Sequence, residues 1–350
     1  MAANYDAFLL VSFGGPEGPD DVMPFLENVL RGKNVPRERM LEVAEHYNHF
    51  GGVSPINSQC RELLEALKVE FAASGVDLPI YWGNRNWTPM LRDTMEQMKK
   101  DGVKRAIAFF TSAYSSYSGC RQYRENIMTA QQEVGEGAPA VDKLRVFFNH
   151  PGFIEPMIAR TRDAIAKLPP EKQAGVKILF TAHSIPMGMA TNCRYEVQLS
   201  EASRLVAEGV NIPDWKLVYQ SRSGPPSQPW LEPDVSDALA TIAAEHPGAG
   251  VVVVPIGFIS DHMEVMFDLD EEAMHKAGEL GLSMVRAATV GSDPQFVQMI
   301  RQLVVERMSD NPERLVLGQL PPNHDVCPAD CCKYEPVRPP MGAGRPAARP

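Results

Sequence analysis

Short apolar runs separated by longer, helix-like stretches recur along the whole chain and fall into two sets of four. The first set is AFLLVSFGGP, PIYWGNRNW, RAIAFFTSAYSS and KLRVFFNHPGF, and the second is VKILFTAHSIP, KLVYQSRSGPP, GVVVVPIGFISDH and LSMVRAATVGSDPQF. Such runs, alternating with helices, are typical of strands buried in parallel sheets. In both sets the fourth run leads through Pro and Phe into a helix. The sequence therefore predicts a duplicated four-strand unit.

The repeat predicts an α/β protein with two Rossmann-like domains, each a four-stranded parallel sheet flanked by helices. A length of 350 residues suffices for two such domains. We place the first domain at 1–168 and the second at 175–320, on either side of the linker LPPEKQAG. A Cys-rich segment follows at 321–335. The last residues, 336–350, are rich in Pro, Gly and Arg without apolar periodicity, which predicts a disordered tail.

Charge and composition exclude several classes of protein. The net charge is −10 and no basic patch is visible, so nucleic acid is not expected as a partner. No apolar run approaches the roughly 20 residues that span a bilayer, and the first run lacks the preceding basic residues of a signal peptide. We expect a cytoplasmic protein whose six cysteines are thiols or metal ligands. The first run is followed by FGGPEGPDD, which matches no nucleotide-binding fingerprint.

Three carboxylates follow the four-valine run closely, in the stretch SDHMEVMFDLDEEA. On a helix, Glu264, Asp268 and Glu272 are spaced i, i+4 and i+8, which places them in one row. A solvated helix face would explain such a row. However, open α/β sheets build their sites at the carboxyl ends of their strands, which favours a functional interpretation. His183 closes the first strand of the second set just before Pro186; it is either structural or part of that same site.

Five motifs together carry a resemblance to a known family: TAHSIP, SDHMEVMFDLD, FGGPEGPDDVMPFLENV, HFGGVSPIN and QSRSGPPSQPWLEPDV. In this combination the chain resembles ferrochelatase of the actinobacterial type, the enzyme that inserts ferrous iron into a porphyrin in haem biosynthesis. The resemblance implies the class II chelatase fold, a porphyrin cleft between the domains, and His183 and Glu264 facing the centre of the macrocycle. It implies porphyrin and ferrous iron as ligands, with transient partners from the haem pathway.

The chemistry of these residues agrees with the resemblance. A free-base porphyrin must lose its pyrrole protons as the metal enters, so the site needs a base near the ring. Histidine titrates near neutral pH, which makes His183 our candidate base. Glu264, Asp268 and Glu272 supply hard oxygen ligands that can hold and relay a divalent ion, and His183 with Glu264 would contact it at the ring. A passing cation would also relieve the repulsion within the row.

The resemblance further implies a porphyrin pocket and a substrate. The implied pocket residues, for which ordinary packing is the alternative role, are Phe13, Arg31, Tyr47, Ser54, Tyr117 and Trp230. Firmicute members have Tyr where this chain has Phe13, which removes one axial oxygen. The actinobacterial likeness and the lack of an apolar lip favour coproporphyrin III, converted to coprohaem; protoporphyrin IX is the alternative. A non-catalytic porphyrin or iron carrier, or a partner-binding protein that keeps the fold, are alternatives of other classes.

Three cysteines cluster near the C-terminus, in NHDVCPADCCKYEP. Zinc would prefer two separated C-x₂-C pairs, which this chain lacks, whereas an iron–sulfur cluster needs four thiolates. Ferrochelatases of several lineages carry a [2Fe–2S] cluster with one internal and three C-terminal ligands. That likeness implies Cys120, Cys327, Cys331 and Cys332 as ligands. Because adjacent ligands are awkward, Cys193 is the reserve, and Cys60 is expected to be an ordinary thiol.

Overall fold

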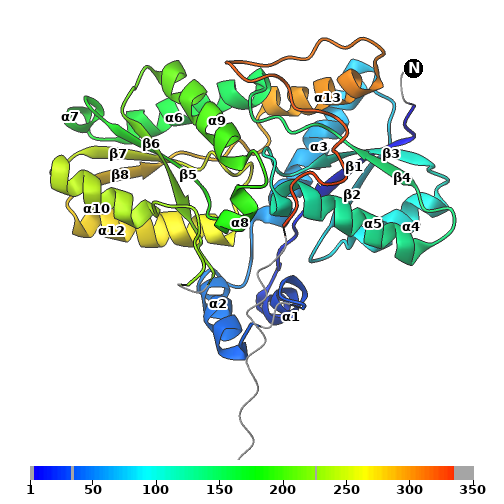
Figure 1. Cartoon of the computed structure of the whole chain (residues 1–350), viewed down its shortest axis with the longest axis horizontal. Coiled ribbons are helices and arrows are strands. Elements are labelled where there is room, and N and C mark those ends of the chain that lie inside the picture. The colour runs from blue at the N-terminus through cyan, green and yellow to red at the C-terminus, as the bar shows by residue number, and fades with distance from the viewer. Residues whose placement is uncertain (1–3, 33–34, 225–226, 335–350) are drawn as a thin grey trace, which may run out of the picture.

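Parallel strands form two separate four-stranded sheets in the computed structural model, which describes residues 4–32, 35–224 and 227–334 (Figure 1). The first sheet has the order β2 (Ile80–Asn84), β1 (Ala7–Ser12), β3 (Arg105–Phe110) and β4 (Ala140–Lys143). The second has the order β6 (Trp215–Gln220), β5 (Lys177–His183), β7 (Gly250–Val254) and β8 (Ser283–Arg286). Both sheets share one strand order, which confirms the predicted fold of two four-stranded parallel units.

The fourth strand of the first sheet differs from its predicted position. It covers Ala140–Lys143, whereas the apolar run behind the prediction, residues 144–148, is buried without strand structure. The Leu144 amide still bonds to the Ala108 carbonyl at 2.8 Å, but the chain then leaves the sheet. Its four apolar side chains, Leu144, Val146, Phe147 and Phe148, join the core between the two halves. Apolar character here reflects burial rather than pairing, which a run of letters alone cannot distinguish.

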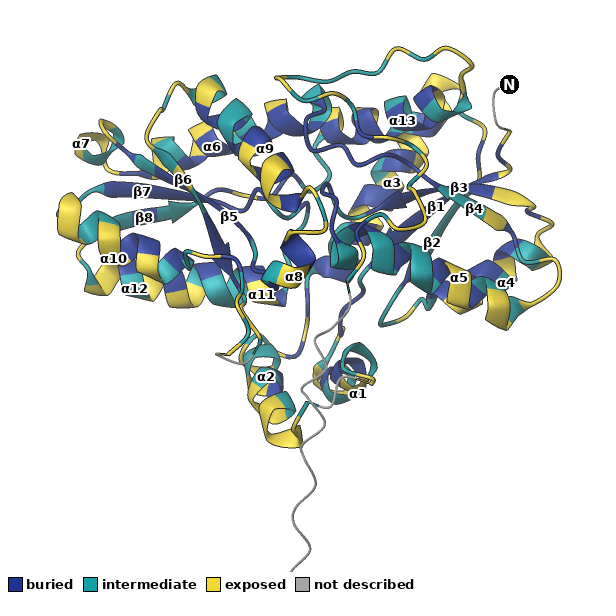
Figure 2. Cartoon of the chain, viewed as in Figure 1, coloured by how far each residue is buried: buried dark blue, intermediate teal, exposed yellow. Residues whose placement is uncertain are grey.

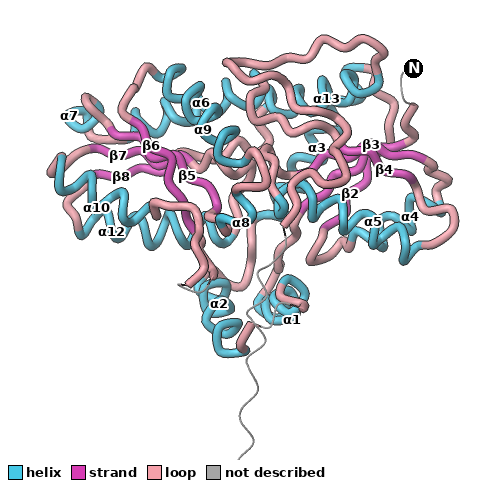
Figure 3. Tube along the Cα trace, in the orientation of Figure 1, coloured by secondary structure: helices cyan, strands magenta, loops and turns pink. Residues whose placement is uncertain are grey.

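The helices follow the strands in the expected alternation (Figure 3). In the first half they are α1 (Pro19–Val29), α2 (Arg37–His49), α3 (Ile56–Ser74), α4 (Leu91–Lys100), the π-helix η1 (Tyr117–Arg121), α5 (Gln122–Val134), α6 (Pro151–Lys167) and α7 (Pro170–Gln173). In the second they are α8 (Met187–Ala190), α9 (Tyr195–Val210), α10 (Val235–Glu245), α11 (Met263–Val265), the π-helix η2 (Met266–Ala273), α12 (Met274–Glu279) and α13 (Pro294–Met308). None of the helices in the described ranges is long and apolar enough to cross a membrane.

One hydrophobic core joins the two halves, as the dark interior of Figure 2 shows. It lies on one face of each sheet and includes residues of α3, α6, α9 and α13. The opposite faces carry smaller cores, with α4 and α5 on the first sheet and α10, η2 and α12 on the second. One long helix of each unit crosses over to the other: α6 packs against α9, β7 and β8, and α13 packs against α3. The predicted boundary at 168–175 stays a prediction, and the tail at 336–350 lies outside the described residues.

Helices α1 and α2 project from the body formed by the two sheets (Figure 1). They enclose a small core of their own, made of Val22, Phe25, Leu26 and Ala44. Phe13, at the end of β1, and Tyr47 of α2 pack against this core. The projecting pair therefore holds two of the expected pocket residues in one aromatic cluster.

Candidate active site

His183 is the last residue of β5, at the carboxyl end of the second sheet. Its Nδ1 lies against the carbonyl oxygen of Ser184, and because a carbonyl only accepts, Nδ1 carries the proton of the neutral ring. The Tyr195 hydroxyl donates to the His183 carbonyl at 3.2 Å and fixes the backbone. Nε2 is therefore the basic nitrogen, and it lies 3.6 Å from Oε2 of Glu264. The two residues predicted to face the macrocycle are brought together.

A buried row of side chains orients the acidic row. Val265, Leu269 and Ala273 are fully buried and anchor η2 in the core of the second sheet. Each of them follows one acidic residue, so Glu264, Asp268 and Glu272 also lie along one side of the helical segment. Glu264 and Glu272 are exposed and Asp268 is half-buried between them. The row expected on an α-helix is carried largely by a π-helix, a form common at functional sites.

Asp268 is the acidic residue most strongly affected by its surroundings. Its Oδ2 accepts hydrogen bonds from the Ser221 hydroxyl and from Nε2 of Gln220, the latter at 3.2 Å. Ser221 has a φ of 60°, a left-handed conformation that aims its side chain at the carboxylate. The pKa of Asp268 is raised to about 7, chiefly by burial and also by the charges of Glu264 and Glu272, which together outweigh the lowering effect of the Ser221 and Gln220 bonds. Near neutral pH this carboxyl group exists in both protonation states.

His262 is a site residue that the sequence reasoning missed. It immediately precedes α11, and burial lowers its pKa. The charge of Glu264 raises that pKa and the charge of His183 lowers it, so the imidazole lies close to both. The signal was present in the sequence, because His262 stands two residues before Glu264 in the motif SDHME.

Arg286, at the end of β8, clamps the start and the middle of the acidic segment. Its guanidinium donates to Asp270 of η2 at 2.6 and 2.8 Å and to Asp261 at 3.0 and 3.4 Å. The Thr289 hydroxyl donates to Asp261 at 3.2 Å. The Asp261 amide donates to the side chain of Gln59 in α3 at 2.9 Å, which links the clamp to the other half. This network fixes η2 relative to the two sheets.

Helix α2 approaches η2 from the projecting pair of helices. Burial raises the pKa of Tyr47, and the charge of Glu264 adds to that rise, so the phenol lies close to this carboxylate. The His46 ring stacks on Phe267 with centroids 3.8 Å apart, and His49 Nε2 lies 3.5 Å from Glu271 Oε1. The expected pocket residue Tyr47 thus lies close to Glu264 of the His183–Glu264 pair.

The remaining expected pocket residues, Trp230, Tyr117, Arg31 and Ser54, differ in their burial and in their contacts. Trp230 forms an antiparallel bridge with Pro186, three residues after His183. The Tyr117 hydroxyl, in η1, donates to Glu125 at 3.1 Å, and Arg31 is exposed and donates to Asn28 at 2.6 Å. Ser54 is only 4% exposed, and a Cβ on Gly15 would come within 2.7 Å of its Cβ. Binding roles for these residues stay predictions.

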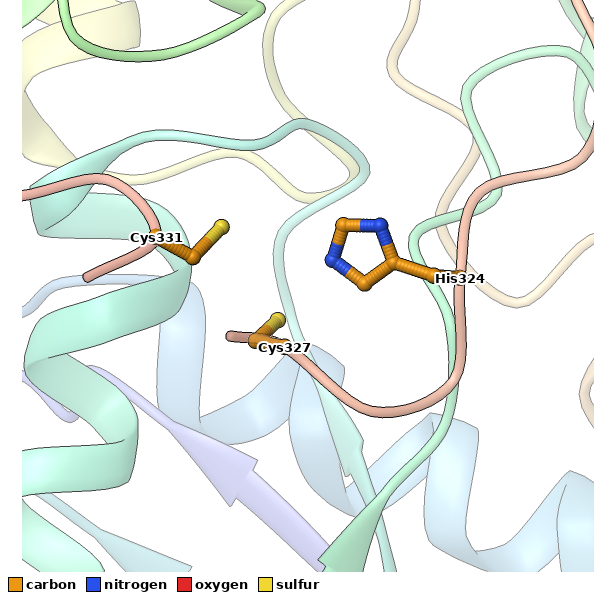
Figure 4. Close-up of side chains that lie close together, drawn as sticks. All are labelled: His324, Cys327 and Cys331. Atoms are coloured by element: carbon orange, nitrogen blue, oxygen red, sulfur yellow. The ribbon is translucent and has the colours of Figure 1, made fainter. Parts of the chain in front are cut away.

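The cysteines form a second site at η1. Figure 4 shows the His324 ring and the thiols of Cys327 and Cys331 pointing toward one another, and their ligand atoms all lie within 4.8 Å of one another. Sγ of Cys332 lies 3.5 Å from Sγ of Cys331. Interaction with the Cys120 thiol lowers the pKa of Cys327, with help from the charge of Lys143, and the same interaction raises the pKa of Cys120.

The donor set of this second site fits a metal group bound by thiolates. The four cysteines implied by the resemblance gather from η1 and the C-terminal segment, and such soft donors suit iron–sulfur clusters and zinc. Arg121 donates to the carbonyls of Ala329 and Cys331, each at 3.0 Å, and thereby holds the segment. The reserve ligand Cys193 lies near Cys331. Burial is the main cause that raises the pKa of the Cys193 thiol, and the charge of Cys331 adds a smaller increase.

One residue of the second site was not expected from the sequence. Sequence reasoning missed His324, which lies with the thiols of Cys327 and Cys331 in one group, and imidazole and thiolate together are also donors that zinc accepts. By contrast, Cys60 lies elsewhere, buried in α3, with its sulfur 3.3 Å from the Ser12 hydroxyl, as an ordinary thiol would.

Comparisons with known proteins identify the family. The family model described as Ferrochelatase matches residues 5–308. A protein of Rhodopirellula baltica named Ferrochelatase is 64% identical over 98% of this chain and 97% of its own length. Proteins of Streptomyces griseus and Streptomyces coelicolor, both named Coproporphyrin III ferrochelatase, are 50% and 51% identical, each over 99% of this chain and 96% of its own.

A solved structure shares the fold. SirB from Bacillus subtilis with Fe³⁺ superposes with a TM-score of 0.56 at 11% identity, covering 88% of this chain and 97% of that one. At this identity the likeness concerns the fold alone, and it confirms the expected chelatase architecture.

Proposed function

The chain belongs to the ferrochelatase family, and from this premise we propose that it inserts ferrous iron into coproporphyrin III to form coprohaem. The observation that carries the proposal is the His183–Glu264 pair, in which a basic imidazole nitrogen lies 3.6 Å from a carboxylate oxygen at the carboxyl end of β5. Porphyrin metallation needs both a proton acceptor and a metal ligand close to the ring nitrogens, and this pair supplies both.

Each residue has a role in the proposed reaction. His183 accepts a pyrrole proton at Nε2, while its Nδ1 stays bonded to the Ser184 carbonyl, so the ring keeps its orientation. The resulting imidazolium is stabilised by the Glu264 carboxylate. His262, beside both, adds a further group able to carry a proton away from the ring.

Ferrous iron would approach along the acidic row. The exposed carboxylate of Glu272 meets the ion first, Asp268 exchanges a proton for it, and Glu264 delivers it to the ring nitrogens. The pKa of about 7 suits Asp268 to this role, because the group binds a cation and releases it again at small cost near neutral pH.

The choice of coproporphyrin III is supported by the names of the two Streptomyces relatives, whereas the name of the Rhodopirellula relative specifies no porphyrin. Comparing kcat/KM for coproporphyrin III and protoporphyrin IX, without oxygen, tests this choice. A preference for protoporphyrin IX would reverse it. Tight porphyrin binding without metallation would instead support the carrier, the alternative of another class.

Substitution of His183 tests the mechanism. We expect His183→Ala to abolish iron insertion while leaving porphyrin binding largely intact, because it removes the proton acceptor rather than the pocket. Glu264→Gln should also be severely impaired, since it keeps the shape but loses the charge that faces Nε2. Initial rates and porphyrin titrations separate the two effects. A His183→Ala variant with near wild-type turnover would contradict the proposed base.

The second site is proposed to hold a [2Fe–2S] cluster through Cys120, Cys327, Cys331 and Cys332. The gathering of these thiols in one place supports the assignment. When bound, such a cluster supplies one-electron chemistry and a covalent tie between η1 and the C-terminal segment. The chain's own part is to present the thiol ligands: the neighbouring Cys120 lowers the pKa of Cys327, and Arg121 fixes the loop carbonyls.

The visible spectrum, together with iron and sulfide content after purification without oxygen, tests the cluster. Cys120→Ser should bleach the protein and lower its thermal stability, because the segment loses its tie. Protein that contains zinc and no sulfide would instead support a zinc site that includes His324, Cys327 and Cys331. A fully coloured Cys120→Ser variant would show that Cys120 is not a ligand and would assign the fourth position to Cys193.

A cytoplasmic location and transient partners that donate iron or accept coprohaem complete the proposal. The location is the expectation drawn from the sequence, and the partners are supported by the need to hand on a reactive product. Fractionation and affinity capture of the full chain in its own cells test both.

A further inference from the structure

Tyr334 follows the cysteine pair by two residues and lies between the two halves of the molecule. Its ring contacts that of Tyr117 in η1, with centroids 5.6 Å apart and planes inclined by 56°. Its hydroxyl accepts a hydrogen bond from Nε2 of Gln228 at 3.4 Å. Its ring edge lies 3.9 Å from where a Cβ on Gly188 of α8 would be. In Figure 1 the red C-terminal segment accordingly runs beside α8.

One neighbour of Tyr334 is an expected porphyrin-pocket residue, and the other two stand close in sequence to residues beside the pocket. Tyr117 is one of its expected residues, and Gln228 stands two residues before another, Trp230. Gly188 follows Pro186, which pairs with Trp230 just beyond His183. An aromatic ring at this junction is well suited to pack against a flat macrocycle.

We propose that Tyr334 positions the porphyrin and that the cysteine site, by fixing the segment that carries Tyr334, increases porphyrin affinity. This inference rests on the proposed function. It assigns the C-terminal cysteines a role in substrate binding, in addition to any redox chemistry, and it assigns Tyr334 as the residue that connects the two sites.

The physical basis is the entropy of ordering a chain segment. The described contacts that hold residues 327–332 to η1 and α5, apart from the thiols, are hydrogen bonds from Arg121 and Arg124 to backbone carbonyls. Cys332 has a φ of 55°, a conformation that a non-glycine residue adopts only when its surroundings impose it. A group bound by these thiols would order the segment in advance, so less entropy is lost when the porphyrin binds.

The coupling must be reciprocal and must depend on the Tyr334 ring. If the cysteine site acts through Tyr334, removing either should weaken porphyrin binding, and removing both should weaken it no more than removing one. A double-mutant cycle measures this non-additivity directly. A cysteine site that only stabilises the fold would instead lower the melting temperature without such an interaction.

The experiment measures binding of metal-free coproporphyrin III by fluorescence titration, without iron or turnover. The proteins are the full-length wild type, Tyr334→Ala, Cys120→Ser and the double variant, purified without oxygen. Tyr334→Ala should keep the visible spectrum and raise Kd roughly two- to tenfold, the range for losing one aromatic contact. Cys120→Ser should raise Kd in the wild-type background and leave it unchanged in the Tyr334→Ala background.

Two controls separate the ring from its surroundings. Val326→Ala changes an exposed side chain of the same segment, 70% exposed, and should bind like the wild type. Tyr334→Phe keeps the ring and loses only a long hydrogen bond, so it should also stay close to the wild type. If Cys120→Ser does not fold, Cys327→Ser replaces it in the cycle.

The outcomes distinguish this inference from the proposed function. A coloured Tyr334→Ala protein with wild-type affinity, or equal effects of Cys120→Ser in both backgrounds, would overturn the inference alone. Wild-type protein that is colourless and holds no metal at these thiols would overturn the coupling. A wild type that binds no coproporphyrin III would overturn the proposed substrate, and with it the inference.

Discussion

Replacing Ser221 with glycine should move the pH dependence of iron uptake to higher pH. The Ser221 hydroxyl is one of two donors to Oδ2 of Asp268, the other being Gln220. Glycine is the suitable substitute because Ser221 has a φ of 60°, which glycine adopts freely and alanine only with strain. The variant therefore removes a hydrogen bond to the carboxylate and leaves the backbone undisturbed.

The expected size follows from that hydrogen bond. A bond to a charged group contributes about 1.5–3 kcal/mol, and its loss raises the pKa of the acceptor by roughly one to two units. Starting from a pKa of about 7 for Asp268, the ionised fraction at pH 7 falls from about half to roughly one to ten per cent. If the ionised form takes up iron, kcat/KM for iron at pH 7 should fall by roughly five- to fiftyfold, mostly through KM.

Initial rates without oxygen, measured against iron concentration between about pH 6 and pH 9, test this prediction. The gap between wild type and Ser221→Gly should close as pH rises, because Asp268 then ionises in both. Thr289→Val is the matched control, since its hydroxyl bonds to Asp261 outside the row, and it should leave the pH profile in place. A Ser221→Gly variant with the wild-type profile would refute the role given to Asp268.

Two further predictions concern η2. The folded-state pKa of Asp268, about 7, lies above its unfolded value near 4, so the folded protein loses stability as pH rises between these values. Asp268→Asn removes this loss and should therefore raise Tm more at pH 8 than at pH 5.5, while it raises the KM for iron. An equal gain in Tm at both pH values would contradict this. Arg286→Met leaves the carboxylates of Asp261 and Asp270 without their guanidinium, so it should lower the free energy of unfolding by about 3–5 kcal/mol and lower kcat. Arg39→Met, at an exposed ion pair, is the control and should lower it by less than about 1 kcal/mol. An Arg286→Met enzyme with unchanged stability and kcat would show that this ion-pair network is dispensable.

Several parts of the fold could be read from the chain. The four-valine run before SDHME predicted a buried strand, and β7 is buried along its whole length. The run ending in His183 and the following Pro186 predicted a strand end there, where β5 ends. These predictions succeed because burial on both faces of a parallel sheet leaves a local mark in the sequence. The run at 144–148 shows the limit, because an apolar segment can be buried without pairing.

The sequence by itself determined the two sheets, the acidic row and the family, because each depends on residue types at short, fixed spacings. The tertiary structure decided which residues meet: Asp268 with Ser221, His262 with Glu264, Arg286 with Asp261 and Asp270, and Cys120 with Cys327. These contacts join segments brought together by sheet order and helix crossing, or, for His262, depend on how one turn folds. The pKa of Asp268 could not be read from the chain for the same reason: it depends on burial and on charges and hydrogen bonds that only the folded chain places around one carboxylate.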